Sequence, residues 1–330
     1  MIEMTDNARV QQDTVEFVAV QPDVVLNNVQ KVIVGKEEVI RLCLVALIAH
    51  GHVLLEDVPG VGKTVLVRAL ARSLDCQFKR IQFTPDLLPS DVTGTSVFNQ
   101  KSAEFEYRPG PIFSQVVLAD EINRTSPKTQ AALLEALEER SVSFDGITHA
   151  LPAPSFVLAT QNPIEYEGTF PLPEAQLDRF LLKLSIGYPS SADELEVLVR
   201  GTTGIHVDDL QPVAGPADIL AWQRAASYVR IDASLYAYVV EIVHKTRVHP
   251  RIYLGVSPRG GLALSRSSQA LAFLAGRDYV LPDDIKQLVP FVLSHRMMLH
   301  PESRFQGITA EDVLTEILHD TAVPVSAQRR

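Results

Sequence analysis

The 330-residue sequence has only two cysteines, Cys43 and Cys76, and no long uninterrupted hydrophobic run. Two cysteines are too few for a disulfide-rich scaffold, and their apolar neighbours on a predicted helix and strand indicate buried thiols. The most apolar stretch, "CLVALIAHGHVLL", is broken by His50 and His52, so we expect no membrane-spanning helix. These two histidines have no third ligand nearby in the sequence, which disfavours a zinc site.

Positive charge is also in short supply, with 30 Lys and Arg against 40 Asp and Glu and a net charge of −10. This balance argues against broad binding to nucleic acid or anionic membranes, although it is compatible with a local basic patch inside an oligomer. The first residues, MIEMTDNARV, are acidic and polar and lack the apolar segment of a signal peptide, which favours a cytoplasmic location. No repeat or low-complexity segment is evident.

The length is typical of two domains, and an apolar share of 46% is ample for their cores. Short apolar runs separated by helical or loop segments predict strands at 53–55, 77–83, 116–119, 156–160 and 180–184. Such runs are typical of a parallel sheet that is covered on both faces. The sequence therefore predicts a three-layer α/β domain.

The domain boundaries follow from changes in pattern along the chain. Residues 1–20 are expected to form a flexible arm, and residues 21–188 the α/β core. Within the core, one helix is expected to end at Gly35 and the next helix to span residues 36–50. The turn-rich stretch 86–111 interrupts the helical and strand patterns and predicts an insert after the second strand. Ser126-Pro127 opens a helix as N-cap and first residue, and Asp145-Gly146 predicts a two-residue hairpin turn.

Past Tyr188-Pro189 the pattern becomes helical. Ser191 and Glu194 form a predicted capping box, residues 189–214 read as a linker, and 215–330 as a smaller, all-helical domain. In this second domain Ser257 is a predicted N-cap, and Gly260-Gly261 in the following turn indicates a close approach by another backbone.

The stretch "LLEDVPGVGKT" resembles a phosphate-binding loop, whose pattern is G-x-x-x-x-G-K-[ST]. Asp57 stands where the first glycine belongs, but Gly62, Lys63 and Thr64 have the required spacing, and Pro59-Gly60 is suited to turn the backbone. A predicted strand precedes the loop and a helix follows it, which places its amides at a helix N-terminus. The expected nucleotide-binding residues here are Pro59, Gly60, Val61, Gly62, Lys63, Thr64 and Val65.

The stretch "VVLADEINR" supplies the acidic residues that such a loop needs. Asp120 ends an apolar strand at the carboxyl edge of the sheet, where it is suited to hold Mg²⁺ together with Thr64. Glu121 beside it is suited to polarise the attacking water as a general base.

Together these residues resemble the AAA+ ATPases. The resemblance implies that Asn162, at the end of "VLATQNP", is the sensor 1 residue and that Arg179, in "PLPEAQLDRF", is the arginine finger that reaches a neighbouring subunit's nucleotide. It also implies that Arg259, in "GVSPRGGLAL", is sensor 2 and that Val34-Gly35 packs the adenine ring. The simpler interpretations are a turn amide for Asn162, a surface salt bridge for Arg179 and a helix C-cap for Gly35, and a frayed helix start is the alternative for Gly260-Gly261.

The set "EDVPGVGKT", "LADEINR", "QAALLEALEE" and "SPRGGLAL" resembles, more narrowly, the MoxR branch of the helix-2-insert clade, over residues 20–300. In that branch the first glycine of the loop is often replaced, and the insert follows the second strand. The resemblance implies ATP and Mg²⁺, a homo-oligomeric ring, hexameric in this branch, and a displaced lid. Whether Arg259 acts within its own subunit or across a boundary stays open.

The implied function is that of a ring-forming chaperone that remodels or matures a client protein complex. Members of the branch often work with a von Willebrand factor A domain partner and sometimes help metal insertion. The alternatives are a magnesium-chelatase-like ATPase subunit and a nucleotide-gated scaffold with little turnover. A DNA motor is disfavoured by the acidic balance.

Overall fold

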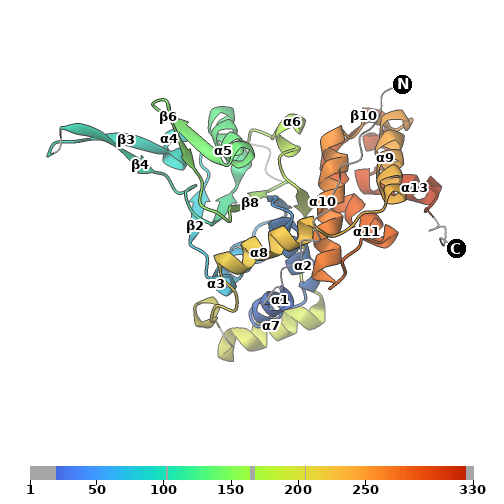
Figure 1. Cartoon of the computed structure of the whole chain (residues 1–330), viewed down its shortest axis with the longest axis horizontal. Helices are drawn as coiled ribbons and strands as arrows, with labels where there is room; N and C mark the ends of the chain where they lie inside the picture. The colour runs from blue at the N-terminus through green and yellow to red at the C-terminus, as the bar shows by residue number, and fades with distance from the viewer. Residues whose placement is uncertain (1–19, 102, 164–167, 205, 325–330) are drawn as a thin grey trace, which may run out of the picture.

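The computed structural model describes residues 20–101, 103–163, 168–204 and 206–324. Nearly all of the expected N-terminal arm, residues 1–19, lies outside this part of the chain. A five-stranded parallel sheet is centred in one half of the molecule, and a helical domain forms the other half (Figure 1). The strand order is β2–β5–β8–β1–β9, with bounds Phe78–Gln82, Val116–Asp120, Phe156–Gln161, Val53–Glu56 and Leu182–Leu184.

The sheet has a helical layer on each face, as the apolar runs predict. Side chains alternate along each strand, so Val53 and Leu55 join one hydrophobic cluster while Leu54 joins another on the opposite face. The first cluster includes residues of α1 (Asp23–Val29), α2 (Glu37–Ile48) and α3 (Lys63–Ser73), and the second includes residues of α5 (Pro127–Glu139). The three-layer α/β core is thereby confirmed.

Two hairpins extend from the core beyond the sheet. After α4 (Pro89–Thr93), β3 (Gly94–Asn99) and β4 (Glu104–Pro109) form an antiparallel arm that projects from the body (Figure 1). It falls in the predicted insert. A second hairpin, β6 (Ser141–Phe144) and β7 (Ile147–Ala150), turns at Asp145-Gly146, both of which have positive φ as such a turn requires. Tyr107 of the first hairpin stacks on Phe144 and His149 of the second, so the two hairpins are in contact.

The C-terminal half is a helical domain with a short strand pair in addition. The stretch expected as a linker contains α7 (Ser191–Thr203) and η2 (Val207–Asp209), and α6 (Glu174–Leu177) and η1 (Ile122–Arg124) are short elements of the core. Beyond the linker the elements are α8 (Pro216–Ser227), α9 (Ala233–Val248), β10 (Ile252–Leu254), α10 (Pro258–Leu274), α11 (Pro282–Leu293), η3 (Ser294–Arg296), β11 (Met298–Leu299), α12 (Pro301–Phe305) and α13 (Ala310–Asp320).

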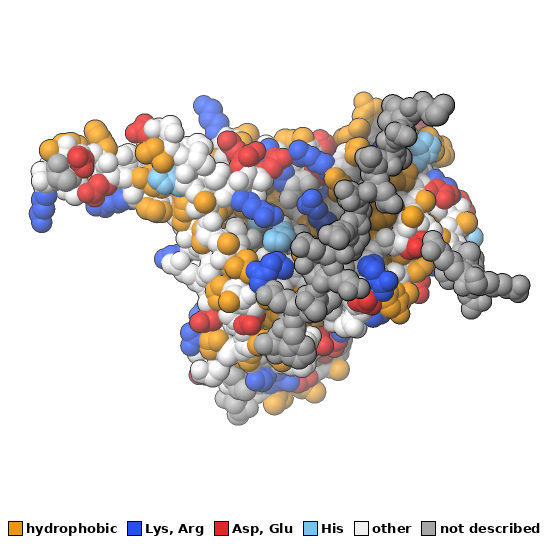
Figure 2. All heavy atoms as spheres, in the orientation of Figure 1, with side chains coloured by type: hydrophobic (Ala, Val, Ile, Leu, Met, Phe, Trp, Pro, Cys, Tyr) orange, Lys and Arg blue, Asp and Glu red, His pale blue; other side chains and the backbone are white. Residues whose placement is uncertain are grey.

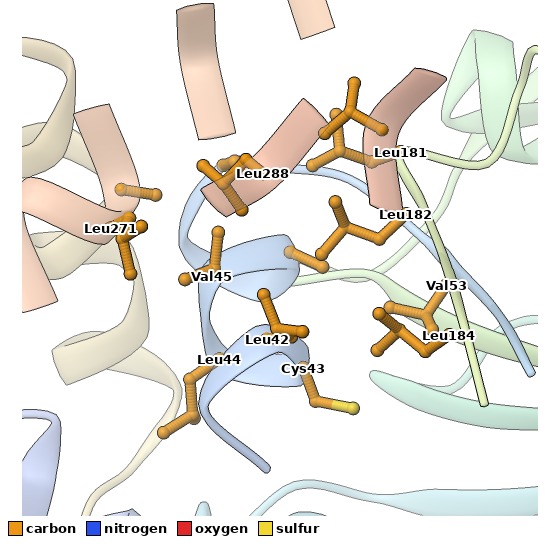
Figure 3. Packing of buried hydrophobic residues seen from close by; sticks show 14 of the residues in the cluster. Leu42, Cys43, Leu44, Val45, Val53, Leu181, Leu182, Leu184, Leu271 and Leu288 are labelled. Atoms are coloured by element: carbon orange, nitrogen blue, oxygen red, sulfur yellow. The ribbon is translucent and has the colours of Figure 1, made fainter. Parts of the chain in front are cut away.

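Helix α2 joins the two halves. Its residues Leu42 and Val45 lie between Leu182 of the sheet and Leu271 and Leu288 of the helical domain (Figure 3). All belong to one buried cluster that crosses from the core into the helical domain, so a hydrophobic interface connects the two. In the same cluster Cys43 is a buried free thiol whose pKa burial raises to about 12. Cys76 is free and partly buried.

Three local expectations need correction. Helix α1 ends at Val29 and not at Gly35, because a turn with Gly35 in the left-handed region follows it. The N-cap of α7 is Ser190, one residue before the predicted Ser191; its hydroxyl accepts from the Asp193 amide at 3.2 Å and donates to Asp193 Oδ2 at 2.6 Å. The tight neighbours of Gly260 are the Val256 and Arg296 side chains and not another backbone, and Gly261 has ordinary space around it.

Within the described residues no helix is long and apolar enough to cross a membrane, and no group of histidine, cysteine and acidic side chains is arranged to hold a metal ion. In the pair His50 and His52, Nδ1 of the buried His52 accepts a hydrogen bond from the Val157 amide at 3.1 Å.

Candidate nucleotide site

The phosphate-loop residues lie at the carboxyl edge of the sheet, between β1 and α3. Gly60 and Gly62 have φ values of +88° and +89°, a conformation that favours glycine. Their neighbours line a cleft of about 350 Å³, formed by Pro59, Gly60, Gly62, Lys63, Thr64, Val65, Arg80, Asp120, Glu121 and Asn162. Val61 packs against the hydrophobic cluster beneath the loop and is not among the lining residues.

Lys63, the first residue of α3, is held by the loop itself. Its Nζ donates to the Asp57 carbonyl at 2.7 Å. Burial lowers the pKa of the Lys63 ammonium, and three nearby carboxylates oppose that shift. The lysine is therefore a partly desolvated cation at the mouth of the cleft, where attraction to an anion is stronger than in bulk water.

Asp120 ends β5 and Glu121 follows it, and both line the cleft with the loop residues. Thr160 Oγ1, on the neighbouring strand β8, donates to Asp120 Oδ1 at 2.6 Å and accepts from the Glu121 amide at 2.8 Å. Glu121 has φ +58° and ψ +48°, a left-handed conformation that costs a non-glycine residue free energy. A strained residue fixed by its neighbours is typical of a functional site.

Sequence reasoning missed two residues on β2 that hold these carboxylates. Arg80 donates to Asp120 Oδ2 from Nε at 3.0 Å and from a terminal nitrogen at 2.6 Å, and Gln82 donates to Glu121 Oε2 at 2.6 Å. Arg124 also pairs with Glu121, at 2.9 Å. The period-2 alternation of β2 was a usable signal, because it places Arg80 and Gln82 on one face of the strand next to β5.

The remaining predicted residues on this side lie around the same edge. Asn162 follows β8 and is buried in the cleft wall. Val34-Gly35 belongs to the turn before α2 and is not among the cleft-lining residues. A Cβ at Gly35 would lie 2.3 Å from the Asp193 carboxylate, so this turn packs tightly against the start of α7.

Arg179 and Arg259 lie elsewhere. Both pair with Glu138 at the end of α5, each at 2.9 Å, and they line a second cleft that shares no residue with the first. The parallel register pairs Leu182 with Val53, so Arg179 precedes the sheet on its amino edge while the phosphate loop follows β1 on the carboxyl edge. Four strand residues, roughly 13 Å of rise, separate these two edges. Arg179 therefore points away from its own phosphate loop.

The second cleft is basic in an otherwise acidic chain. Arg140, Arg179, Arg259 and Arg266 line it, and Arg296 is buried beneath, with Glu138 and Asp178 as the acidic counterparts. Basic side chains gather in the middle of the face shown in Figure 2, between the core and the helical domain. Such a local excess of positive charge is suited to meet phosphate or an acidic surface.

The residues present fit a nucleoside triphosphate with Mg²⁺. Nothing lies within 4 Å of the position that a Cβ would take at Gly60 or Gly62, so the space above the loop is open. In the part of the chain that the structure describes, the amides of Gly60, Val61, Gly62 and Lys63 have no protein acceptor. Free amides at a helix N-terminus bind phosphate, and the hydroxyl and carboxylate oxygens of Thr64 and Asp120 are ligands that Mg²⁺ prefers.

The sheet order, the loop and the acidic pair define the class of protein. Residues 52–182 match the ATPase family associated with various cellular activities (AAA), and residues 244–317 match the AAA lid domain. The chain is thus an AAA+ ATPase core followed by a helical lid.

Comparison with individual proteins narrows the class. The chain is 61% identical to protein YeaC of Bacillus subtilis over 300 residues, which cover 91% of this chain and 94% of YeaC. It is 42% identical to Chaperone MoxR1 of Mycobacterium tuberculosis over 306 residues, which cover 90% of this chain and 81% of MoxR1. A crystal structure from Cytophaga hutchinsonii is similar with a TM-score of 0.86 and 41% identity, covering 92% of this chain and 94% of that one.

The chain belongs to the MoxR-type AAA+ ATPases. The likeness to magnesium chelatase is more distant: subunit ChlI-1 of Arabidopsis thaliana is 27% identical over 219 residues, which cover 61% of this chain and 48% of ChlI-1.

Proposed function

We propose that this chain hydrolyses ATP to ADP and phosphate in a homo-oligomeric ring and uses the resulting motion to remodel or mature client protein complexes. The observation that supports this most strongly is the position of Arg179. The cleft at the phosphate loop contains a lysine, an acidic pair, an asparagine and Arg80, which is paired with Asp120, while Arg179 lies at the opposite edge of the sheet. A ring that places this edge against the next subunit's loop would complete the site.

Binding would use the loop amides and Lys63. The four free amides of residues 60–63 face an anion with the N-terminus of α3 behind them, and Lys63 Nζ would exchange the Asp57 carbonyl for a phosphate oxygen. Val34-Gly35 would pack the adenine ring. Mg²⁺, held by Thr64 and Asp120, would supply neutralisation of phosphate charge. Asp120 would have to exchange its contact with Arg80 to take this role.

Hydrolysis would depend on Glu121 and Asn162. Glu121 is held by Gln82 and Arg124, and it acts as general base once its carboxylate is released toward the attacking water. Asn162, at the end of the neighbouring strand, would orient that water. Lys63 on one subunit and Arg179 on the next would stabilise the charge that develops on the transferred phosphoryl group.

Arg259 is suited to act across the same boundary. It shares Glu138 with Arg179 and lines the same basic cleft, at the edge away from its own loop. A heterologous interface that repeats this contact closes into a ring, for which we propose six subunits.

The two hairpins are the segments that we assign to the client. They project from the core and are in contact through Tyr107, so a lid shift after hydrolysis would move them together. We further propose a von Willebrand factor A domain partner, a role for some clients in metal insertion, and a cytoplasmic location, with which the two free thiols agree.

The first test measures phosphate release by the full chain with Mg²⁺ and ATP. Lys63→Ala should lose ATP binding, whereas Glu121→Gln should keep it and lose about two to four orders of magnitude in rate. Glu241→Gln, on the surface of α9, is the matched control and should keep the native rate. A Glu121→Gln protein that hydrolyses ATP at the native rate would remove Glu121 from the proposed mechanism.

A further inference from the structure

Asp57 occupies the position where a glycine begins the standard phosphate loop, and its side chain is buried. The carboxylate accepts three hydrogen bonds from the segment that follows β9. Ser185 Oγ donates to it at 2.9 Å, the Ile186 amide at 2.5 Å and the Gly187 amide at 3.1 Å. We call residues 185–190 the connecting segment, because they join β9, the last strand of the core, to α7, after which the chain continues to the lid.

The backbone of Asp57 contacts the catalytic groups. Its carbonyl accepts from Lys63 Nζ at 2.7 Å, and its amide donates to the carbonyl of Gln161, the residue before Asn162, at 3.2 Å. A single residue therefore touches the phosphate-binding lysine, the end of the strand that carries Asn162, and the connecting segment.

The far end of the connecting segment contacts the other side of the nucleotide site. Lys36 Nζ donates to the Tyr188 carbonyl at 2.9 Å, and Gly35 has no room for a Cβ against Asp193. The segment is thus attached at one end to the phosphate loop and at the other to the turn to which we assign the adenine ring.

A glycine at position 57 cannot make the first attachment. A buried carboxylate is costly unless it is well hydrogen-bonded, and here two backbone amides and a hydroxyl satisfy it. Hydrogen bonds to an ionised acceptor are shorter and stronger than neutral ones, so they hold the segment firmly against the loop. The side chain faces away from the cleft, since Asp57 is not among the residues that line it.

We propose that Asp57 is a positioning residue that couples the phosphate loop to the lid. When a nucleoside triphosphate binds, Lys63 Nζ exchanges the Asp57 carbonyl for a phosphate oxygen and the loop shifts. Because the Asp57 carboxylate is bonded to residues 185–187, this shift moves those residues and, through α7, the lid. This coupling rests on the proposed function, and it explains why the chain has an aspartate where the standard phosphate loop has a glycine.

Asp57→Gly is the decisive variant because it restores the standard loop pattern while it removes the carboxylate. Three quantities are measured on the full chain: affinity for a fluorescent ATP analogue, kcat and KM for ATP, and hydrogen exchange of the peptide that contains residues 185–187, with and without a non-hydrolysable analogue. We expect affinity within about threefold of native and kcat lower by about tenfold or more. Exchange at Ile186 and Gly187 should become faster and should no longer respond to nucleotide.

Asp57→Asn keeps one acceptor oxygen and should lie between the native chain and Asp57→Gly. Asp284→Asn is the matched control, since Asp284 is also a buried carboxylate that accepts from a backbone amide, in the lid helix α11. It should lower stability and leave kcat and the nucleotide response of residues 185–187 unchanged.

Native kcat and a native nucleotide response in Asp57→Gly would overturn the coupling. If Asp57→Gly does not fold, the same measurements are made on Asp57→Asn. Native kcat and a native exchange response to nucleotide in that variant then overturn the proposal. If the native chain binds nucleotide without hydrolysis, the proposed function fails, but the exchange response still tests the coupling by itself.

Discussion

At the scale of single residues, the site depends on side chains whose positions are fixed by contacts from other strands. Thr160 holds Asp120 and the Glu121 amide from β8, while Arg80 and Gln82 hold the two carboxylates from β2. Each acidic group thus has protein partners, which the proposed mechanism requires it to exchange for Mg²⁺ or the attacking water. The structure describes the residues in this partnered arrangement.

A second residue-scale feature is the buried histidine at the amino edge of the sheet. Burial lowers the pKa of His52 to about 4 from an ordinary 6.5, with a smaller lowering from Arg140. The folded chain therefore favours the neutral ring, while the unfolded chain takes up a proton near pH 6.5. The stabilisation is complete above pH 6.5 and is lost as pH falls from 6.5 toward 4, by roughly 3 kcal/mol.

We expect the free energy of unfolding to fall between pH 7 and pH 5, and to fall less steeply in His52→Asn, whose side-chain oxygen can accept from the Val157 amide as Nδ1 does. Urea unfolding at several pH values measures this. His244→Asn, on the exposed face of α9, is the control and should keep the native slope. If the free energy of unfolding depends on pH equally steeply in His52→Asn and the native chain, His52 is not the source of this pH dependence.

At the scale of elements, the segment that carries Arg179 is clamped by the lid. Arg296, in η3, is 8% exposed and donates to Asp178 Oδ1 at 2.7 Å, to the Phe180 carbonyl at 2.7 Å and to the Leu181 carbonyl at 3.1 Å. Burial lowers the pKa of its guanidinium, and Asp178 opposes that shift. The lid thus fixes the residues on either side of Arg179.

Arg296→Met should lower the free energy of unfolding by about 3 kcal/mol, because it leaves the Asp178 carboxylate and four backbone carbonyls without this donor. Arg296→Lys keeps the charge but loses the planar fork, so it should lower stability by less. Urea unfolding of the native chain, Arg296→Lys and Arg296→Met measures the order of their stabilities. A methionine variant as stable as the native chain would show that this clamp contributes nothing.

Much of this element arrangement could be predicted from the sequence. The apolar runs give the five parallel strands, and the N-cap Ser126 and the turn Asp145-Gly146 act through local chemistry that a sequence displays. The contacts of Asp57 with Gly187 and of Arg296 with Asp178 could not be predicted, because they join residues 130 and 118 positions apart. For Arg80 the alternation along β2 indicated the face of the strand but not the partner Asp120, 40 positions away. The N-cap of α7 was misplaced by one residue because two serines, Ser190 and Ser191, stand side by side there.

At the scale of the whole molecule, charge is distributed unevenly. A chain of net charge −10 places five arginines along one cleft at the amino edge of the sheet, while the cleft at the carboxyl edge holds the acidic pair Asp120 and Glu121 together with Lys63 and Arg80. Different surfaces on opposite edges of one subunit are suited to a head-to-tail contact, and such contacts close into a ring when the rotation between neighbouring subunits closes. The proposed shared active site is the functional consequence of this distribution.

The most direct measurement is the ATPase rate of a mixture of two inactive variants, Arg179→Ala and Glu121→Gln, with each variant alone as control. In a mixed ring, an Arg179→Ala subunit supplies an intact Glu121, and a neighbouring Glu121→Gln subunit supplies an intact Arg179. Random mixing at equal amounts gives complete sites at about a quarter of the interfaces, so the rate should rise toward that share of the native rate. A mixture that stays as inactive as its components, although its subunits exchange, would contradict a site shared between subunits.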